Sequence, residues 1–298
     1  MSGNFGGIEL GGTKTVVVLG HPGDIRERLE FPTTTPDETL SHALDIIQRW
    51  HERVRLDAVG VASFGPLRLD HSAADFSAVL QTPKPGWTGT RILPRMAETL
   101  DLPIAVDTDV AAAALAEHKF GAAQGCSVMV YLTIGTGLGG GILIHGVPVH
   151  GALHPEIGHV RLRRAVGDIF AGGCPFHGDC AEGLLGGPAL ALRFGAHPSH
   201  FGAGDPVWDP VAHDLAELLG MLILTLSPQR IVVGGGVANK QPHLLLGAVS
   251  RIPEIIRGYV PDCTKEELER RIVPAALGDD AGPTGALILA EYMGITSG

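Results

Sequence analysis

The sequence predicts a compact α/β protein built from two domains of similar topology. Hydrophobic residues make up 45% of the 298 residues, charged residues make up 18%, and 42 residues are glycine. This composition is typical of folded α/β chains and unlike that of disordered ones. The length allows two domains that share a cleft. Two units of strand, glycine turn and strand, at residues 6–19 and 127–144, each open one half of the chain, so we expect two similar domains facing each other.

The first glycine unit reads Gly-Gly-Ile-Glu-Leu-Gly-Gly-Thr-Lys over residues 6–14 and precedes the β-branched run at 15–19. Such a turn exposes backbone N–H groups and the Thr13 hydroxyl to an anion, here a phosphate. An ordinary hairpin turn fits the same residues. A Walker P-loop does not fit, because no lysine follows Gly12 directly and no helix follows the turn.

The remaining elements of the first half lead to a pair of aspartates. The expected elements are a helix over residues 40–54, a buried strand at 58–62, a loop at 82–87 (Thr-Pro-Lys-Pro-Gly-Trp) and a helix over 91–100. A short strand at 104–106 then runs into Asp107-Thr108-Asp109 and an alanine-rich helix over 110–120. Asp107 or Thr108 can serve as the helix N-cap, which leaves a carboxylate free to point into a cleft. Asp109 is therefore a candidate catalytic residue.

The second glycine unit, Gly135-Thr-Gly-Leu-Gly-Gly-Gly141, matches the dinucleotide fingerprint Gly-x-Gly-x-x-Gly by letter. That fingerprint must open a helix, whereas the run 142–144 predicts a strand. We therefore expect a hairpin here, and the stronger phosphate cradle of the two. The elements expected after it are helices over 209–226, 243–259, 265–270 and 282–293, a strand at 230–233, and glycines at 234–236 that suit either an adenine base or a plain turn.

Two histidines and two cysteines predict a zinc site. They are spaced His159-x14-Cys174-x2-His177-x2-Cys180. Four ligands of this kind suit one tetrahedral Zn²⁺, and three of them lie on a single loop. The carboxylates Glu156 and Glu182 stand beside these ligands in sequence. The alternative is a glycine-rich surface loop that holds two thiols. The glycines favour the metal site, because a loop that carries several ligands needs their backbone freedom.

Charge and patterning exclude several classes of partner. The formal net charge of −10 argues against a sequence-independent grip on nucleic acid. The most apolar run, residues 218–226, is far shorter than the roughly 20 residues of a membrane span. The N-terminus lacks the pattern of a secretory signal, and four cysteines do not make a disulfide framework. We expect a cytoplasmic protein with no nucleic-acid or membrane partner.

Motifs along nearly the whole chain resemble the ROK family of sugar kinases, within the actin-like ATPase (ribonuclease H-like) fold. They are Ile8-Glu-Leu-Gly-Gly-Thr-Lys14, Ile134-Gly-Thr-Gly-Leu-Gly-Gly-Gly141, Glu156-Ile-Gly-His159 and Ile231-Val-Val-Gly-Gly-Gly236. The segments 62–66, 82–87, 107–110 and 174–182 are most similar to bacterial zinc-containing fructokinases. The resemblance implies a smaller domain of residues 1–118 plus the closing C-terminal helix 281–298. It also implies a larger domain of residues 119–280 that carries the zinc loop.

The resemblance implies a transferase of carbohydrate metabolism that uses ATP to phosphorylate a hexose. The expected reaction converts D-fructose to fructose 6-phosphate. Mannose, glucose, allose or an N-acetylhexosamine are alternative acceptors, and a catalytically weak sugar-binding regulator is an alternative function. Repressors of the same family carry a helix-turn-helix domain ahead of the first hairpin, which here begins at Gly6. We expect sugar and ATP as ligands, Mg²⁺ and Zn²⁺ as metals, and a homodimer.

The same resemblance assigns roles to individual residues. Asp109 resembles the catalytic base that takes the proton of the attacking sugar hydroxyl. The implied sugar-binding residues are Glu156, His159, Glu182, Asp107 and Thr108. The implied ATP-binding residues are Gly11, Gly12, Thr13, Lys14, Thr136, Gly137, Gly235 and Gly236. The implied zinc ligands are His159, Cys174, His177 and Cys180, with His159 also touching the sugar. Glu9 occupies a position near Mg²⁺ and the phosphates, and Ala111 stands where an asparagine is expected.

Overall fold

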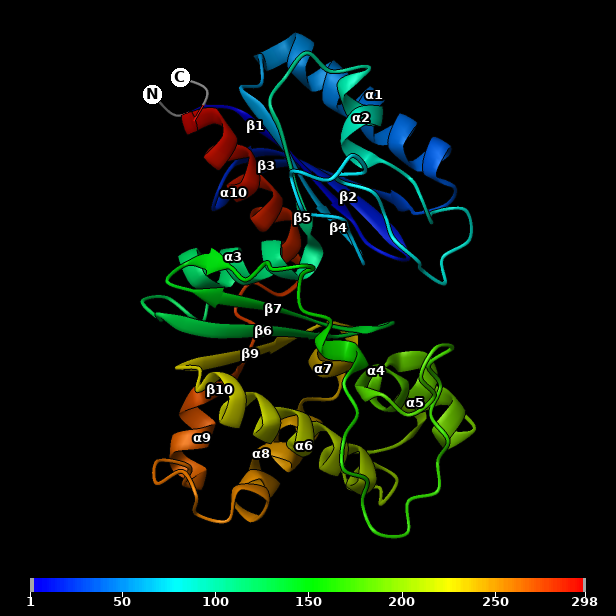
Figure 1. The fold of residues 1–298 in the computed structure, drawn as a ribbon, viewed down its shortest axis with the longest axis vertical. Coiled ribbons are helices and arrows are strands. Elements are labelled where there is room, and N and C mark those ends of the chain that lie inside the picture. Colours follow the sequence, from blue (N-terminus) through cyan, green and yellow to red (C-terminus); the bar gives the residue numbers. More distant parts are fainter. Residues whose placement is uncertain (1–2, 297–298) are drawn as a thin grey trace. The chain divides into compact units, whose positions relative to one another are not determined.

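The fold is that of a computed structural model, which describes residues 3–296. The chain divides into two compact units, drawn in Figure 1. The first unit comprises the residues up to 121, residues 147–155 and the residues from 279 onward, and the second comprises residues 122–146 and 156–278. The boundaries predicted from the sequence lie after residues 118 and 280, and they leave residues 147–155 with the second unit.

The first unit is built on a mixed five-stranded sheet in the order β3-β2-β1-β4-β5. Its strands are β1 (Phe5–Leu10), β2 (Lys14–His21), β3 (Asp24–Pro32), β4 (Ala58–Ser63) and β5 (Ile104–Thr108). β1, β2 and β3 form an antiparallel meander, whereas β1, β4 and β5 are parallel. Residues at the carboxyl ends of parallel strands meet at one edge of a sheet, which is where ligands bind in open α/β sheets. In this register Glu9, Ala62 and Asp107 lie level with one another near that edge.

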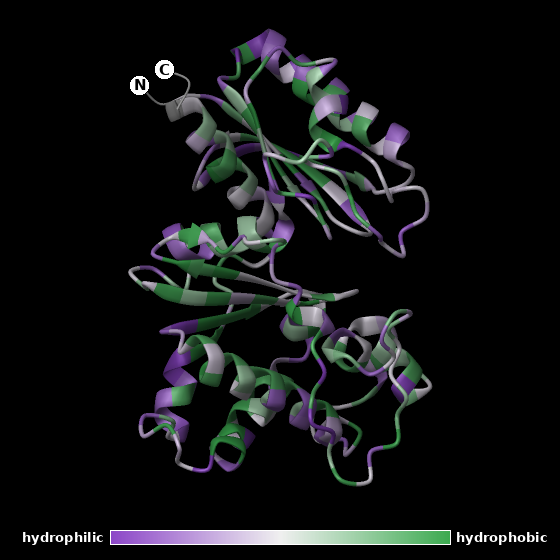
Figure 2. Cartoon of the chain, in the orientation of Figure 1, coloured by the Kyte–Doolittle hydropathy of each residue, from purple (hydrophilic) through white to green (hydrophobic). Residues whose placement is uncertain are grey.

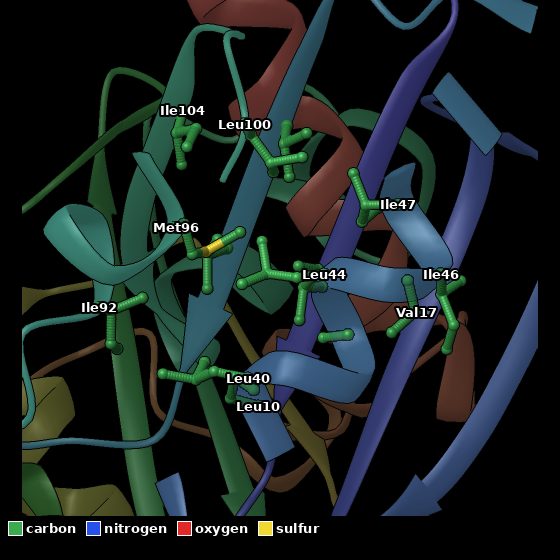
Figure 3. Close-up of a cluster of buried hydrophobic side chains, with 14 of the residues drawn as sticks. Leu10, Val17, Leu40, Leu44, Ile46, Ile47, Ile92, Met96, Leu100 and Ile104 are labelled. Carbon is green, nitrogen blue, oxygen red and sulfur yellow. The ribbon is translucent and has the colours of Figure 1, made fainter. Parts of the chain in front are cut away.

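Two pairs of helices cover the two faces of this sheet (Figure 1). α1 (Pro36–Val54) and α2 (Ile92–Ala97) cover one face, and Figure 3 shows Leu40, Leu44 and Met96 packed against Leu10 and Val17 in that layer. Alternate strand residues therefore face α1, as the period of a strand requires.

α3 (Asp109–Phe120) and α10 (Ala281–Thr296) lie on the opposite face. A β-carbon added at Gly285 of α10 would lie 2.0 Å from the carbonyl oxygen of Ala112 in α3. The two helices therefore approach closely. The small side chains of the buried alanine run of α3, residues 111–114, permit this approach.

The second unit contains a five-stranded sheet in the order β10-β9-β6-β7-β8, in which β6 and β7 form an antiparallel hairpin. Its strands are β6 (Val128–Ile134), β7 (Leu138–Ile144), β8 (Val147–Pro148), β9 (Arg230–Gly234) and β10 (Ile272–Pro274). Its helices are α4 (Ala181–Leu185), α5 (Gly187–Phe194), α6 (Trp208–Leu226), α7 (Gly236–Lys240), α8 (Pro242–Ile256) and α9 (Lys265–Arg271). α6 packs against α8, and Figure 2 shows apolar residues gathered on the central strands of both sheets.

The structure confirms the predicted α/β class and both glycine hairpins. β7 begins three residues after Gly135, so a strand rather than a nucleotide-binding helix follows the second glycine turn, as predicted. Sequence patterns did not predict the strands β3, β8 and β10 or the helices α4, α5 and α7. β3 reads Asp-Ile-Arg-Glu-Arg-Leu-Glu-Phe-Pro and is an edge strand whose charged side chains hide the strand signal. Among the helices of residues 3–296, none is long and apolar enough to cross a membrane.

Candidate active site

Asp109 is the first residue of α3, directly after β5 in the first unit. Thr108 is the N-cap, because its hydroxyl accepts a hydrogen bond from the Ala111 N–H at 3.1 Å. Since Thr108 performs the capping, the Asp109 carboxylate is not needed for it. Asp109 Oδ1 instead accepts the N–H of Val110 at 2.8 Å, which fixes the orientation of the carboxylate.

Partial burial makes the carboxylates of Asp109 and Glu9 hard to ionise. Desolvation raises the pKa of Asp109 to about 7, against hydrogen bonds that lower it. Desolvation also raises the pKa of Glu9 to about 7, and the charge of Asp109 contributes further to that rise. The two groups are therefore electrostatically coupled. At neutral pH each is poised between its acid and its base form, a property found at functional sites more often than elsewhere.

Asp107 takes part in a contact that the sequence analysis did not predict. Its Oδ1 lies 3.1 Å from His150 Nε2 and also accepts the N–H of Thr108 at 2.7 Å. The hydrogen bond to Asp107 raises the pKa of His150, although burial opposes the rise. The nearby His154 is buried, and its Nε2 accepts the N–H of Leu67 at 3.0 Å. The segment 147–155 thus delivers two histidines to the first unit.

The first glycine turn, between β1 and β2, has the form of an anion cradle. The carbonyls of Gly11 and Thr13 accept hydrogen bonds from the hydroxyl and N–H of Thr33, at 2.8 and 3.0 Å. Within residues 3–296 the N–H groups of Gly12 and Thr13 have no partner, so they are open to a ligand. The predicted ATP-binding Lys14 extends instead toward Glu30, with its Nζ 3.2 Å from Glu30 Oε2.

The second unit brings the four predicted zinc ligands together. Their ligand atoms all lie within 4.8 Å of one another, and they are His159, Cys174, His177 and Cys180. His159 Nδ1 is 3.6 Å from Cys180 Sγ and 3.9 Å from Cys174 Sγ, and His177 Nδ1 is 3.8 Å from Cys174 Sγ. Tetrahedral bonds of about 2.3 Å to sulfur and about 2.1 Å to nitrogen would hold neighbouring ligand atoms about 3.6 Å apart. The cluster therefore fits a metal ion of this kind.

The chemistry of the cluster agrees with its geometry. Burial raises the pKa of the Cys180 thiol to about 11, so a thiolate here at neutral pH needs a cation beside it. Because His159 presents Nδ1 to the sulfurs, its Nε2 is left on the other side of the ring for another partner.

Backbone pairing folds this loop tightly. Cys174 and Gly178 exchange two backbone hydrogen bonds, and the N–H of Ala181 donates to the Val160 carbonyl at 2.9 Å. A β-carbon at Gly183 would lie 1.9 Å from the Gly178 carbonyl oxygen, so a side chain at position 183 would disrupt the loop.

Glu182 connects this loop to the second glycine turn. Its Oε2 accepts the N–H of Leu138 at 3.1 Å and would lie 2.6 Å from a β-carbon on Gly137. Within the described chain the N–H groups of Thr136 and Gly137 have no partner. They form a second candidate anion cradle.

The glycines after β9 lie beside this turn, since the Gly236 nitrogen would be 3.7 Å from a β-carbon on Gly135. Gly235 is the N-cap of α7 and has a positive φ of 91°. The structure therefore gathers the predicted residues of the second unit, Glu182, Thr136, Gly137, Gly235 and Gly236, into one region.

A cavity elsewhere in the second unit does not include these residues. It has a volume of about 710 Å³ and is lined mainly by the loop 165–170, with Arg193, Asp209, Pro210 and Arg251. The candidate site therefore rests on the arrangement of its side chains and turns, and not on this cavity.

Comparison with known proteins identifies the family to which these features belong. Residues 5–292 match the model of the ROK family. The chain belongs to the ROK family. A protein from Zymomonas mobilis named fructokinase is 38% identical over 295 residues, covering 96% of each chain. A fructokinase from Pediococcus pentosaceus is 36% identical over 290 residues, covering 96% of this chain and 97% of its own.

Solved ROK structures share the fold. A ROK glucokinase from Streptomyces griseus, in complex with glucose and AMPPNP, superimposes with a TM-score of 0.76 at 26% identity and covers 97% of this chain and all of its own. The predicted actin-like fold is therefore confirmed. The motifs that identified the ROK family did not predict the contacts of two polar side chains, those of His150 with Asp107 and of Lys84 with Gly12. The sequence offered a signal for Lys84 alone, as the residue between two prolines in the loop 82–87.

Proposed function

We propose that this chain is an ATP-dependent hexose kinase that converts D-fructose to fructose 6-phosphate. The observation that carries the proposal is its identity of 36–38% to proteins named fructokinase, over 96% of the chain. Relatives named glucokinase are more distant, at 28–29% identity. Fructose is therefore the preferred acceptor of this proposal.

Asp109 is proposed as the base that accepts the proton of the attacking sugar hydroxyl. A base works best when its pKa lies near the operating pH, and burial supplies this by raising the pKa of Asp109 to about 7. The hydrogen bond from the Val110 N–H holds one oxygen, so the carboxylate is oriented before the sugar arrives. General-base catalysis of this kind contributes on the order of 10²–10⁴ in rate.

The two glycine turns are proposed to bind the phosphates of ATP. Phosphoryl transfer depends mainly on positioning and on neutralising charge, for which backbone N–H groups are well suited. Gly11, Gly12, Thr13 and Lys14 are the proposed phosphate residues of the first unit. Thr136, Gly137, Gly235 and Gly236 are the proposed nucleotide-binding residues of the second. Glu9 would hold the Mg²⁺ that accompanies ATP, because a desolvated carboxylate with a raised pKa gains most from a nearby cation.

Zinc is proposed to shape the sugar-binding residues of the second unit. With four protein ligands a zinc ion has no open coordination position, so its contribution would be structural. Holding His159 through Nδ1 would keep the proton on Nε2, which could then donate to a sugar oxygen. Glu156 precedes that histidine by three residues and Glu182 follows Cys180 by two, and both are proposed to accept sugar hydroxyls.

The test is sugar-dependent release of ADP from ATP. The purified protein should release ADP when fructose is added, and Asp109→Asn should reduce kcat by about 10²–10⁴. Asp45→Asn is the matched control, because Asp45 lies on the exposed side of α1 and its variant should behave as wild type. A protein that releases no ADP with any hexose, although it is folded and loaded with metal, would refute the proposed function.

A further inference from the structure

The loop 82–87 of the first unit is anchored at one end by Trp87. Trp87 is fully buried, its Nε1 donates to the Thr34 carbonyl at 2.8 Å, and its ring lies edge-on to Phe64 with centroids 5.0 Å apart. Two prolines flank Lys84 and restrict the backbone on both sides of it. The backbone position of Lys84 is thus restricted by the buried Trp87 and by the two prolines.

The anchored loop delivers the Lys84 ammonium to the first glycine turn. Lys84 Nζ donates to the carbonyl of Gly12 at 2.6 Å and to the carbonyl of Thr33 at 3.1 Å. An ammonium group has three N–H donors, so one donor remains after these two bonds.

The charge of this ammonium is not neutralised by the protein. Among the described residues, no carboxylate oxygen lies within 4.0 Å of Lys84 Nζ. Lys14, the other lysine at this turn, pairs with Glu30 and is half exposed. Its two protein partners are neutral carbonyls, and its contact with Gly12 is exposed, so an anion can approach the ammonium. Lys84 is therefore the cation of this turn that lacks a counter-charge.

The glycine turn also offers N–H donors to an anion. The carbonyls of Gly11, Gly12 and Thr13 are all engaged, by Thr33 and by Lys84, whereas the N–H groups of Gly12 and Thr13 have no partner within residues 3–296. A β-carbon at Gly12 would meet no atom within 4 Å, so the turn is open on that side. A tetrahedral anion is the ligand that matches two backbone donors and an uncompensated ammonium.

We propose that Lys84 binds the terminal phosphate of ATP through its third N–H, while its other two bonds hold the glycine turn in its anion-binding form. This inference rests on the proposed kinase function and assigns a role to a residue outside the predicted site. The terminal phosphate is favoured because of the position of the turn. Glu9 precedes the turn by two residues and interacts electrostatically with Asp109. The turn is therefore close to the proposed base, Asp109. The phosphate nearest the proposed base is the one under attack.

The test compares the affinities of MgATP and MgADP, measured by isothermal titration calorimetry without sugar, for the wild type and for Lys84→Met. A charge-assisted hydrogen bond to a phosphate corresponds to a change of about 10- to 100-fold. Lys84→Met should therefore weaken MgATP by about that factor more than it weakens MgADP. Lys265→Met removes an equivalent charge from an exposed helix position and should alter neither affinity.

The outcomes separate this inference from the proposed function. Equal weakening of MgATP and MgADP would mean that Lys84 acts only through the shape of the turn, and unchanged affinities would mean that it has no role. Either result overturns the inference even when the wild type phosphorylates sugars. If the wild type phosphorylates no sugar, the loss of MgATP affinity alone still supports the contact. Lys84→Arg, which keeps the charge, should retain the preference for MgATP over MgADP, and Lys84→Gln replaces Lys84→Met under the same criteria if the latter does not fold.

Discussion

Replacing Asp109 with asparagine should make the protein less active and more stable at once. Burial raises the pKa of Asp109 from 3.8 to about 7, so ionising this group costs more in the folded than in the unfolded protein. Each unit of pKa corresponds to about 1.4 kcal/mol, which gives about 4 kcal/mol as the upper limit above pH 7. Asparagine keeps the shape of the side chain and cannot ionise, so its folded state does not bear this cost.

The sign and pH range follow from the two pKa values. Well below pH 3.8 the wild-type group is neutral in both states, and the variant gains nothing. As pH rises from 3.8 to about 7 the unfolded wild type releases its proton first, so the folded wild type loses stability relative to the variant. Between pH 5.5 and pH 8 the advantage of Asp109→Asn should grow by about 2 kcal/mol.

The assay is urea unfolding at both pH values beside steady-state kinetics, with Asp45→Asn as the control. The wild-type rate should rise with pH through an apparent pKa that belongs to the coupled pair Asp109 and Glu9. That rise should be absent from Asp109→Asn. A variant that keeps more than about a tenth of the wild-type kcat, or whose stability advantage is independent of pH, would refute the reasoning.

Two further predictions concern the zinc loop and the His150 contact. Cys180→Ser should lower the zinc content, measured by mass spectrometry, to below about 0.2 per chain, and it should weaken fructose binding. Cys263→Ser is the control and should do neither. Normal fructose binding by zinc-free protein would contradict this prediction. His150→Gln should destabilise the protein by about 0.5–1 kcal/mol at pH 6 and by less at pH 9. The Asp107 carboxylate raises the pKa of His150, so the stabilisation from this pair is lost as pH rises through that pKa. Equal destabilisation at both pH values would show that the pairing charge does not matter.

Local patterns in the sequence predicted the parts of the site that lie within one stretch of chain. The run Cys174-x2-His177-x2-Cys180 forms a hairpin closed by backbone bonds between Cys174 and Gly178, so its spacing alone brings three ligands together. The glycine turns were predictable for the same reason, since each joins two adjacent antiparallel strands.

Contacts between distant segments were not predictable from one sequence. His150 reaches Asp107 from 43 positions away, and Lys84 reaches Gly12 from 72 positions away. Such pairs depend on how the loops pack after the sheet has formed, and hydrophobic periodicity carries no information about them. The raised pKa of Asp109 is likewise a property of its buried surroundings and not of its neighbours in sequence.

The central claim, that fructose is the preferred acceptor for ATP-dependent phosphorylation, is tested most directly by kcat/KM over a panel of hexoses. The panel comprises fructose, mannose, glucose, allose and N-acetylmannosamine at saturating MgATP, with sugar phosphate identified as the product. We predict that fructose exceeds every other sugar by about tenfold or more, with mannose second. A value for glucose or N-acetylmannosamine that exceeds the value for fructose by about tenfold would contradict the account.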